Sequence, residues 1–474
     1  MKVLLLALVL ILIGPSQGRA DNQEAGSLVH ATQSVNAHGP AHGKEASSSD
    51  LHGGADDTFS YHKSMLPLDT ADYLTLSFSA FSLFLAAAGG IGAGGILVPL
   101  YMIIWKFYPK NSIALCNLTV LGGSIANVIL SVKKTTPDGS PVIDWNIVLM
   151  MEPSTMAGAI VGSLVAKYLP DFVLVVCLSV ILACLSYRTL GMGMTMFRTE
   201  SEQRVQPLGA AVFSEDKDIE LERLATGDVP VEKTREVGAD ATVDCSEGAY
   251  SPVAKIALLI LCLLGCIGLT MLKSVAPRLG VACGSPTYYI LSGATVPWVG
   301  IFCIVFRGML LRERGAAASR GEIVWDSDTT VRFPLACIFA GVFAGLFGVG
   351  AGIVKGPLML EMGVQPAKAA ATAATMVLFT CCAAHVSFAS FGLVEPDYGR
   401  LCFSLGFVCT AIGQVVTDTW MQRARRQSPP VLSIGVVMSI SALLVWAQVA
   451  KILQETGLDS ERLLGLFTPS PVCK

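Results

Sequence analysis

Charged residues are scarce in this chain. They make up 15% of its 474 residues, whereas soluble domains carry about 25%. Hydrophobic residues make up 53%, and long apolar runs recur from residue 73 to residue 450. Because a bilayer-spanning helix needs ~20 apolar residues, the chain is predicted to be an all-α polytopic membrane protein rather than a set of soluble domains.

The sequence also lacks the motifs of common enzyme classes. It contains no Walker motif, no histidine-rich metal box and no paired catalytic acids. Gly90, Gly92 and Gly95 fit the G-x-G-x-x-G pattern, but apolar helix candidates flank them, whereas a dinucleotide site follows a strand. We therefore expect no enzymatic activity, no catalytic residue and no cofactor. The net charge of −3 and the lack of a basic tail give no reason to expect nucleic acid as a partner.

The fourteen cysteines are not arranged as a disulfide framework. Most lie inside apolar runs, where a free cysteine behaves as a small hydrophobic residue. Cys381 and Cys382 are adjacent and have no metal-ligand spacing. No metal site is therefore expected in the membrane region.

The first seventy residues are expected to precede the membrane region. Residues 1–20 are typical of a signal peptide, because Lys2 precedes a short apolar stretch and small residues suited to cleavage follow. Residues 21–70 are polar and are expected to form a disordered luminal or extracellular leader. Histidines in this leader could collect a metal, but their irregular spacing favours a disordered tract. They are His30, His38, His42, His52 and His62.

Composition divides the rest of the chain at an acidic stretch. After Arg198 this stretch holds thirteen acidic residues against five basic ones, with few aromatics, so a flexible linker is expected. The predicted segments are a first transmembrane repeat (71–197), the acidic linker (198–252), two connecting transmembrane helices with a loop (253–330), a second transmembrane repeat (331–452) and a C-terminal tail (453–474).

The two transmembrane repeats share a glycine-rich arm. Residues 90–100 align without a gap with residues 348–358, and six positions are identical at a separation of 258. A proline and then an apolar helix follow each arm. Asp144-Trp145 in the first repeat also echoes Asp397-Tyr398 in the second. This ordered set of matches indicates an internal duplication.

Each glycine arm is expected to break a helix in the membrane. Residues 73–107 would form a helix of about 52 Å at 1.5 Å per residue, whereas the hydrocarbon core is ~30 Å thick. If each glycine segment turns back as a hairpin, the two repeats have opposite orientations in the membrane. Thirteen lysine and arginine residues then face the cytosol and six face the outside, as the positive-inside tendency favours. The predicted cytosolic set is Lys133, Lys134, Arg198, Arg204, Arg307, Arg312, Arg314, Arg320, Arg332, Lys368, Arg423, Arg425 and Arg426. The predicted outer set is Lys106, Lys110, Lys167, Lys273, Arg278 and Arg400.

The glycine motifs resemble those of the TauE/SafE family of sulfite exporters. Residues 90–127, including Gly122-Gly123-Ser124-Ile125-Ala126-Asn127, are similar to the first signature of eukaryotic members, and residues 350–366 to the second. The resemblance covers residues 70–197 and 250–452. It implies transport of sulfite, sulfonates or related small organosulfur anions without ATP. Cys116 and Ala373 stand where members often have serine, which removes hydroxyl groups from the expected pocket.

The glycine arms are candidate anion sites on physical grounds as well. Glycine permits close backbone approach, and a broken helix leaves N–H groups that attract anions. The alternative is tight helix packing by small residues. A proline at the same place in both arms favours a binding role. The candidate binding glycines are Gly92, Gly94, Gly350 and Gly352.

Polar residues after each arm are further candidates. Asn117, Ser124 and Asn127 lie at i, i+7 and i+10, which places them on one helix face. Thr372 and Thr375 share a face in the second repeat. These groups could hydrogen-bond the oxygens of a sulfonate across the repeat interface. They could equally make interhelical hydrogen bonds, worth ~0.6 kcal/mol on average.

Lys355 interrupts the second apolar arm at the position that matches Leu97 in the first. Intramembrane ionisable residues are costly and usually functional, so this cation is a candidate for attracting an anionic substrate. The alternative is a lysine that snorkels to the interface.

Three acids and one histidine are weaker candidates in the membrane region. Glu152, Glu361 and Asp418 could carry protons or could simply lie at helix ends. His385 is more typical of a packed histidine than of a proton relay.

Taken together, the sequence predicts a secondary transporter in the plasma membrane or an endomembrane, with its N-terminus luminal or extracellular. We expect its partners to be a small anionic substrate and the lipid bilayer, with protons as the candidate coupling ion. The competing hypothesis is a membrane receptor or sensor without transport activity. The internal duplication argues against a receptor, which does not need a repeat.

Overall fold

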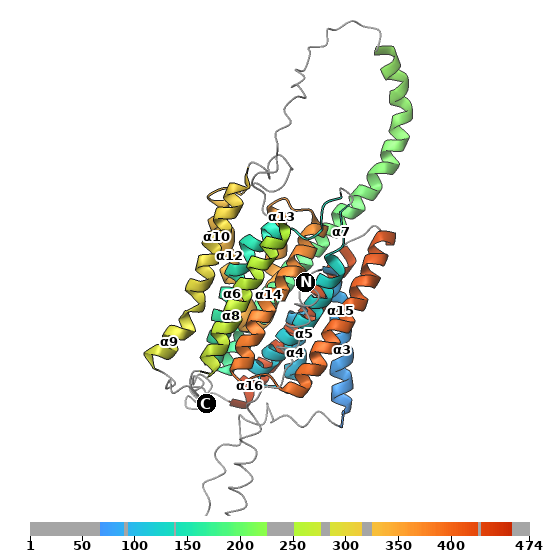
Figure 1. Cartoon of the computed structure of the whole chain (residues 1–474). Helices are drawn as coiled ribbons and strands as arrows, with labels where there is room; N and C mark the ends of the chain where they lie inside the picture. The colour runs from blue at the N-terminus through green and yellow to red at the C-terminus, as the bar shows by residue number, and fades with distance from the viewer. Residues whose placement is uncertain are drawn as a thin grey trace, which may run out of the picture.

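The computed structural model describes residues 67–89, 93–136, 139–224, 251–275, 285–314, 325–424 and 428–456. These residues form an all-helical bundle (Figure 1). The signal peptide, nearly all of the histidine-containing leader and most of the C-terminal tail lie outside the described residues.

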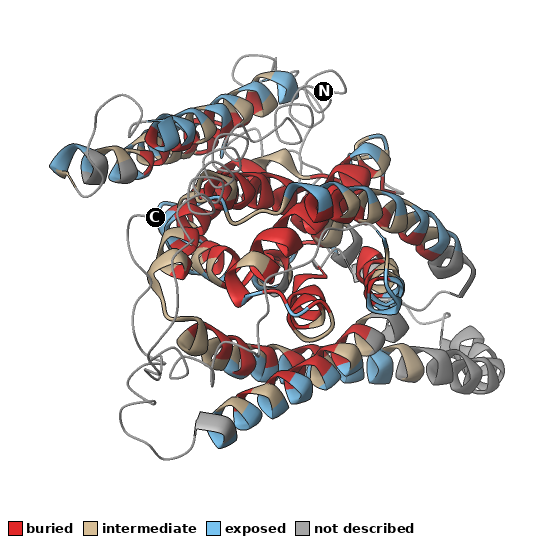
Figure 2. Cartoon of the chain, turned by 90° about the horizontal axis from the view of Figure 1, so that it is seen from below, coloured by how far each residue is buried: buried red, intermediate tan, exposed pale blue. Residues whose placement is uncertain are grey.

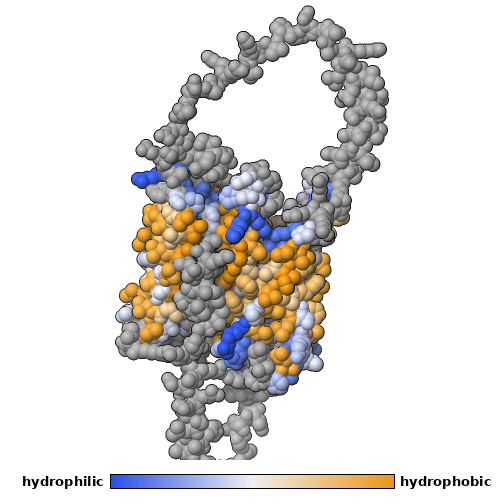
Figure 3. Space-filling view, turned by 45° about the vertical axis from the view of Figure 1, so that its right-hand side comes forward, coloured by the Kyte–Doolittle hydropathy of each residue, from blue (hydrophilic) through white to orange (hydrophobic). Residues whose placement is uncertain are grey.

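Ten of the described helices are long and apolar enough to cross a membrane. Large apolar side chains on the outside, such as Ile304, Phe339 and Leu443, are more than half exposed. On the face that Figure 3 shows, hydrophobic residues form a broad belt, with hydrophilic residues toward its two ends. The prediction of a polytopic all-α membrane protein is therefore confirmed. The ten helices are α3 (Thr70–Gly89), α5 (Pro109–Ser131), α6 (Trp145–Tyr168), α7 (Asp171–Leu224), α8 (Pro252–Val275), α10 (Thr295–Arg312), α12 (Thr329–Phe347), α14 (Pro366–Ser390), α15 (Pro396–Ala424) and α16 (Ser428–Thr456).

Three of these helices form the centre of the bundle. The apolar spans of α5, α6 and α14 are 89%, 83% and 83% buried, whereas the other seven spans are at most 39% buried. Figure 2 shows the buried helices surrounded by helices that expose one face. A polar side chain on a central helix therefore contacts protein rather than lipid.

Both glycine arms break a helix, as the sequence predicts. The first break separates α3 from α4 (Gly94–Ile103), and the second separates α12 from α13 (Gly352–Glu361). At the second break Gly348 and Gly350 have φ angles of 66° and 81°, which glycine adopts without strain. A helix of ten residues spans about 15 Å, which is roughly half of the hydrocarbon core.

The bundle has two polar ends, which we name after the lysines that mark them. At the Lys110 end, the Lys110 Nζ donates a hydrogen bond to the carbonyl oxygen of Lys167, and the ammonium groups of Lys167 and Lys273 lie over the ring of Phe391. At the Lys134 end, Lys134 pairs with Asp418 and Lys368 pairs with Asp144.

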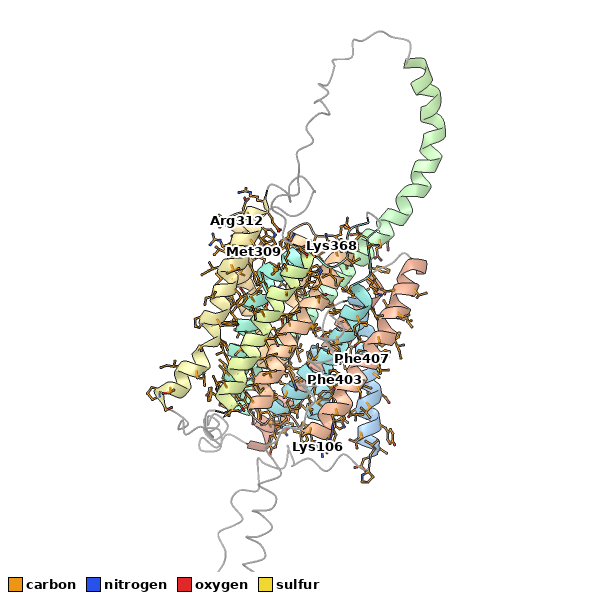
Figure 4. The ribbon with its side chains drawn as sticks, viewed as in Figure 1. Lys106, Met309, Arg312, Lys368, Phe403 and Phe407 are labelled. Atoms are coloured by element: carbon orange, nitrogen blue, oxygen red, sulfur yellow. The ribbon has the colours of Figure 1, made fainter. Side chains whose placement is uncertain are left out.

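The two glycine segments enter the bundle from opposite ends. α3 begins at the lower end of the bundle in Figure 1, and Lys106 lies at that same end in Figure 4. Lys106 follows α4 and precedes Lys110 by four residues, so this is the Lys110 end. Arg312, before α12, and Lys368, after α13, lie together at the other end (Figure 4). This arrangement agrees with two hairpins of opposite orientation. The inverted relation of the repeats, and the assignment of the Lys134 end to the cytosol, stay predictions.

The two breaks meet inside the bundle. A Cβ atom placed on Gly94 would lie 2.0 Å from the carbonyl oxygen of Gly348 and 2.8 Å from Cα of Val349. The Cys116 thiol of α5 donates to the carbonyl oxygens of Gly348, at 3.4 Å, and Gly94, at 3.8 Å. The single S–H group of Cys116 therefore lies within reach of a carbonyl oxygen at each break.

Other glycines let the central helices approach their neighbours closely. A Cβ atom on Gly158 of α6 would lie 2.2 Å from the carbonyl oxygen of Ile338 in α12. A Cβ atom on Gly406 of α15 would lie 2.0 Å from the carbonyl oxygen of Thr119 in α5. Small residues therefore allow close helix packing at these positions outside the glycine arms.

The structure describes the first half of the acidic stretch after Arg198. α7 continues to Leu224, so this half of residues 198–252 is helical, and its role as a linker between the repeats stays a prediction. This part is rich in glutamate, glutamine, arginine, leucine and alanine, which have high helix propensity. Residues 225–250 lie outside the described residues.

Replacement of Gly94 by alanine should destabilise the protein, because the added Cβ would clash with the backbone at Gly348. Overpacking of this kind costs about 1–3 kcal/mol. The measurement is thermal unfolding in detergent. Gly356→Ala is the matched control, since a Cβ there meets no atom within 4 Å. Equal unfolding temperatures for the two variants would contradict the contact between the breaks.

Candidate functional site

A small cavity lies beside the first glycine break. Its volume is about 30 Å³, measured as the space open to the centres of water-sized spheres. A single water needs roughly 10–15 Å³ on this measure, so the cavity can hold a few small polar atoms. It is formed by both halves of the chain and is lined by Leu83, Ala86, Ala87, Ala93, Val120, Gly123, Ser124, Asn127, Ala374, Val377 and Thr410.

Three polar side chains reach the cavity wall. Ser124 and Asn127 lie three residues apart on α5, and Thr410 projects from α15. The Ser124 hydroxyl donates to the carbonyl oxygen of Leu121 at 2.9 Å. Asn127 is 9% exposed, and its Oδ1 atom has no hydrogen-bond partner among the described residues. The Oδ1 atom is an acceptor and would take a donor, whereas an anion in the cavity would need the Nδ2 amino group of the same side chain as its donor.

The N-terminus of α4 adjoins the same cavity. Ala93 precedes Gly94 at the start of α4 and lines the cavity wall. No side chain caps this helix end. Because the first N–H groups of a helix have no intrahelical partner and the helix dipole is positive at this end, the position favours an anion.

A buried ion pair lies where the second glycine arm meets the central helices. The Lys355 Nζ of α13 is 2.5 Å from Oε2 of Glu152 on α6. Thr380 of α14 donates its hydroxyl proton to Oε1 of Glu152 at 2.6 Å, and its oxygen lies 3.4 Å from the Lys355 Nζ. The side chains of Lys355 and Glu152 are both 0% exposed. The snorkelling interpretation of Lys355 is therefore excluded.

The ion pair is electrically neutral as it stands. A charge buried at membrane depth is costly when it is alone, and removal of one partner from a buried pair is strongly destabilising. Glu152 therefore compensates the charge that we expected Lys355 to present to an anion. Glu152 was a candidate proton carrier in the sequence, but its pairing with a residue 203 positions away could not be foreseen.

Other predicted binding residues lie away from the cavity wall. The Asn117 side chain donates to the carbonyl oxygen of Ile113 in its own helix. Thr372 accepts a hydrogen bond from the backbone N–H of Asp144, and Thr375 donates to Ala371. For these three residues the structure shows hydrogen bonds within or between helices.

The predicted glycines are distributed between the two breaks. Gly94 begins α4 beside the cavity, whereas Gly350 and Gly352 form the second break and the start of α13. Gly92 lies outside the described residues.

The remaining ionisable candidates are not partners in the ion pair between Lys355 and Glu152. Glu361 is exposed at the end of α13, and Asp418 pairs with Lys134 at one end of the bundle. His385 is 2% exposed within α14. Of the three candidate acids, only Glu152 is buried.

The repeats carry different chemistry at corresponding positions. Thr380 lies fourteen residues after Pro366, and Gly123, in the cavity wall, lies fourteen residues after Pro109. Lys355 likewise corresponds to Leu97, since 97 plus 258 is 355.

Glu152 also has an apolar counterpart. It follows Asp144 by eight residues, as Leu405 follows Asp397. Lys355 of the second glycine arm therefore pairs with Glu152 of α6. The residues at the corresponding positions, Leu97 in the first arm and Leu405 in α15, are both leucines.

Comparisons with known proteins agree with the glycine motifs. The family model described as "Sulfite exporter TauE/SafE" matches residues 75–214 and 252–445. "Sulfite exporter TauE/SafE family protein 2" of Arabidopsis thaliana is 26% identical over 386 residues, covering 78% of this chain and 81% of the relative. Family protein 5 of the same plant is 26% identical over 375 residues, covering 76% and 79%. No solved structure matches the chain.

Removal of either partner of the buried pair should reduce stability strongly. Glu152→Gln and Lys355→Met are each expected to cost about 3–5 kcal/mol, because each leaves a buried group without its partner. The measurement is thermal or denaturant unfolding in detergent. Asp418→Asn is the matched control, since the Lys134–Asp418 pair is more than one-third exposed and such pairs contribute about 0–1 kcal/mol. Similar losses in all three variants would show that the buried pair has no special role.

Proposed function

The chain belongs to the TauE/SafE family of sulfite exporters, and we propose on that basis that it is a secondary transporter of small sulfur-containing anions. The proposed substrates are sulfite, sulfonates and related organosulfur compounds. Members of this family are transporters rather than enzymes, and the absence of a nucleotide-binding motif from the sequence agrees with transport that does not use ATP.

The cavity beside the first glycine break is the observation that carries this proposal. It combines the N-terminus of α4, whose N-cap residue Ala93 makes no side-chain capping hydrogen bond, with the polar side chains of Ser124, Asn127 and Thr410. Helix N-termini bind anions through backbone N–H groups, and hydroxyl and amide groups can hydrogen-bond anionic oxygens. Among the described residues, no lysine or arginine lines the cavity wall, so neutral hydrogen-bond donors and a helix dipole would hold the anion.

The size and lining of the cavity favour a compact anion. A volume of about 30 Å³ accommodates a small head group rather than a long chain without rearrangement. Its apolar wall, including Leu83, Val120 and Val377, is compatible with the short alkyl part of a sulfonate.

The broken hairpins support a secondary-transport mechanism. The two halves meet at Gly94 and Gly348, and the cavity is lined by residues from both halves. In many secondary transporters broken helices surround a midplane site, and movement of one half against the other exposes the site to each side in turn. We propose the same alternating access here, with the Lys134 end facing the cytosol and the N-terminus on the opposite side.

Radiolabelled sulfite or methanesulfonate should enter proteoliposomes that contain the purified full chain faster than protein-free liposomes. Asn127→Leu should raise the substrate concentration for half-maximal flux by roughly tenfold, because loss of one buried hydrogen-bonding group costs about 1–3 kcal/mol. Asn117→Leu should change this concentration little, since Asn117 bonds within its own helix. Initial rates at varied substrate concentration provide the measurement.

The absence of saturable flux for both anions would overturn the proposed function. Equal effects of the two asparagine substitutions would instead contradict the proposal that the anion binds in this cavity.

A further inference from the structure

The buried ion pair lies close to the proposed anion cavity. Val377 lines the cavity, and Thr380 follows it by one turn on the same helix, α14. Three residues of an α-helix rise about 4.5 Å. A change in the ion pair at Thr380 can therefore affect the cavity wall through a single turn of helix.

The pair also connects the two halves of the chain. Glu152 lies on α6 in the first half, whereas Lys355 and Thr380 lie on α13 and α14 in the second. A movement that separates α6 from α13 must break the contact of 2.5 Å between the ammonium and carboxylate groups. If alternating access moves α6 relative to α13, it would therefore break this ion pair.

We propose that Glu152, Lys355 and Thr380 couple the transported anion to a proton. This inference rests on the proposed function. Binding of the anion is accompanied by protonation of the Glu152 carboxylate, which breaks the ion pair. The Lys355 ammonium group then balances the charge of the anion. Release of the anion allows Glu152 to lose the proton and to pair with Lys355 again.

Charge balance is the physical reason for this coupling. Without an anion, the carboxylate and the ammonium sum to zero. A monovalent anion alone would give the buried core a net charge of −1, which is unfavourable in a medium of low dielectric constant. One proton on Glu152 returns the sum to zero. The core is then neutral both with and without its substrate.

Other titratable groups around the pair do not provide this balance. The groups that interact electrostatically with Glu152 among the described residues include the thiols of Cys337 on α12, Cys381 on α14 and Cys262 on α8. Thiols in apolar surroundings are uncharged near neutral pH. Glu152 is therefore the group of this cluster whose protonation can change the net charge.

Thr380 acts as a positioning residue for the pair. Its hydroxyl donates to Glu152 and lies within reach of the Lys355 ammonium group. The carbonyl oxygen of Met376 lies 3.2 Å from the same hydroxyl oxygen, so it is an alternative acceptor for the single hydroxyl proton when Glu152 is protonated. Thr380→Val should shift the pH of half-maximal flux, and Thr380→Ser should restore it. A normal pH profile in the valine variant would exclude this role.

The test uses the full chain in proteoliposomes with methanesulfonate as the probe. This sulfonate keeps one negative charge across neutral pH, so the pH dependence belongs to the protein and not to the substrate. With the membrane potential clamped at zero, an inward proton gradient should accumulate the probe up to about tenfold per pH unit at a stoichiometry of one proton. Changing the membrane potential at equal pH should cause no accumulation.

Glu152→Gln should abolish the response to the proton gradient and leave only downhill flux at a reduced rate, because glutamine cannot lose a proton. The double variant Glu152→Leu with Lys355→Leu guards against loss of folding, since leucines occupy the corresponding positions Leu97 and Leu405. It should fold, as judged by its elution as a single species in detergent, and should show no accumulation driven by the gradient.

The outcomes separate this inference from the proposed function. Saturable methanesulfonate flux that ignores the proton gradient in the unmodified chain would overturn the coupling and leave the transporter proposal intact. Accumulation driven by the gradient in either Glu152 variant would also overturn the coupling. The absence of flux for both sulfite and methanesulfonate would overturn the transporter proposal and the coupling with it.

Discussion

The contact between the two glycine breaks is the constraint on which the rest of the structure depends. Gly94 and Gly348 approach so closely that a single added carbon atom would overlap the opposite backbone. Four helices therefore end or begin near one place inside the bundle, where they leave backbone polar groups at membrane depth. Such groups are tolerated only where protein or a hydrated cavity satisfies them. Cys116 satisfies part of this requirement, and the cavity at the start of α4 provides a place for a polar guest.

The duplicated architecture carries two different kinds of polar chemistry. The first arm adjoins a cavity with neutral hydrogen-bonding groups, whereas the second arm contributes Lys355 to an ion pair. If both arms adjoined the same kind of cavity, the protein would have two equivalent sites. We propose that anion binding lies at the first arm and charge compensation at the second, one turn of α14 away. In our account this division lets a neutral protein core accept a charged substrate without leaving a buried charge unbalanced.

Local sequence patterns were sufficient to predict the helical class, the two breaks and the family. The helical class and the breaks follow from apolar run length and from glycine clusters, which are properties of neighbouring residues, whereas the family was predicted from the resemblance of the motifs. The roles of individual polar residues depended on helix rotation and on distant partners. Ser124 lines the cavity whereas Asn117, on the same helix, bonds to its own backbone. The partner of Lys355 is 203 residues away. The continuation of α7 to Leu224 follows from the helix propensity of residues in the acidic stretch, which the linker prediction did not take into account.

Access of the cavity to a substrate is the most direct test of this account. Ser124→Cys, in a chain depleted of its other cysteines, places one reactive thiol in the cavity wall. Modification by methyl methanethiosulfonate should slow saturably as methanesulfonate is added, whereas sodium chloride at the same ionic strength should have no such effect. A labelling rate that is identical with and without methanesulfonate would contradict the central claim that sulfur-containing anions bind between the two broken helices.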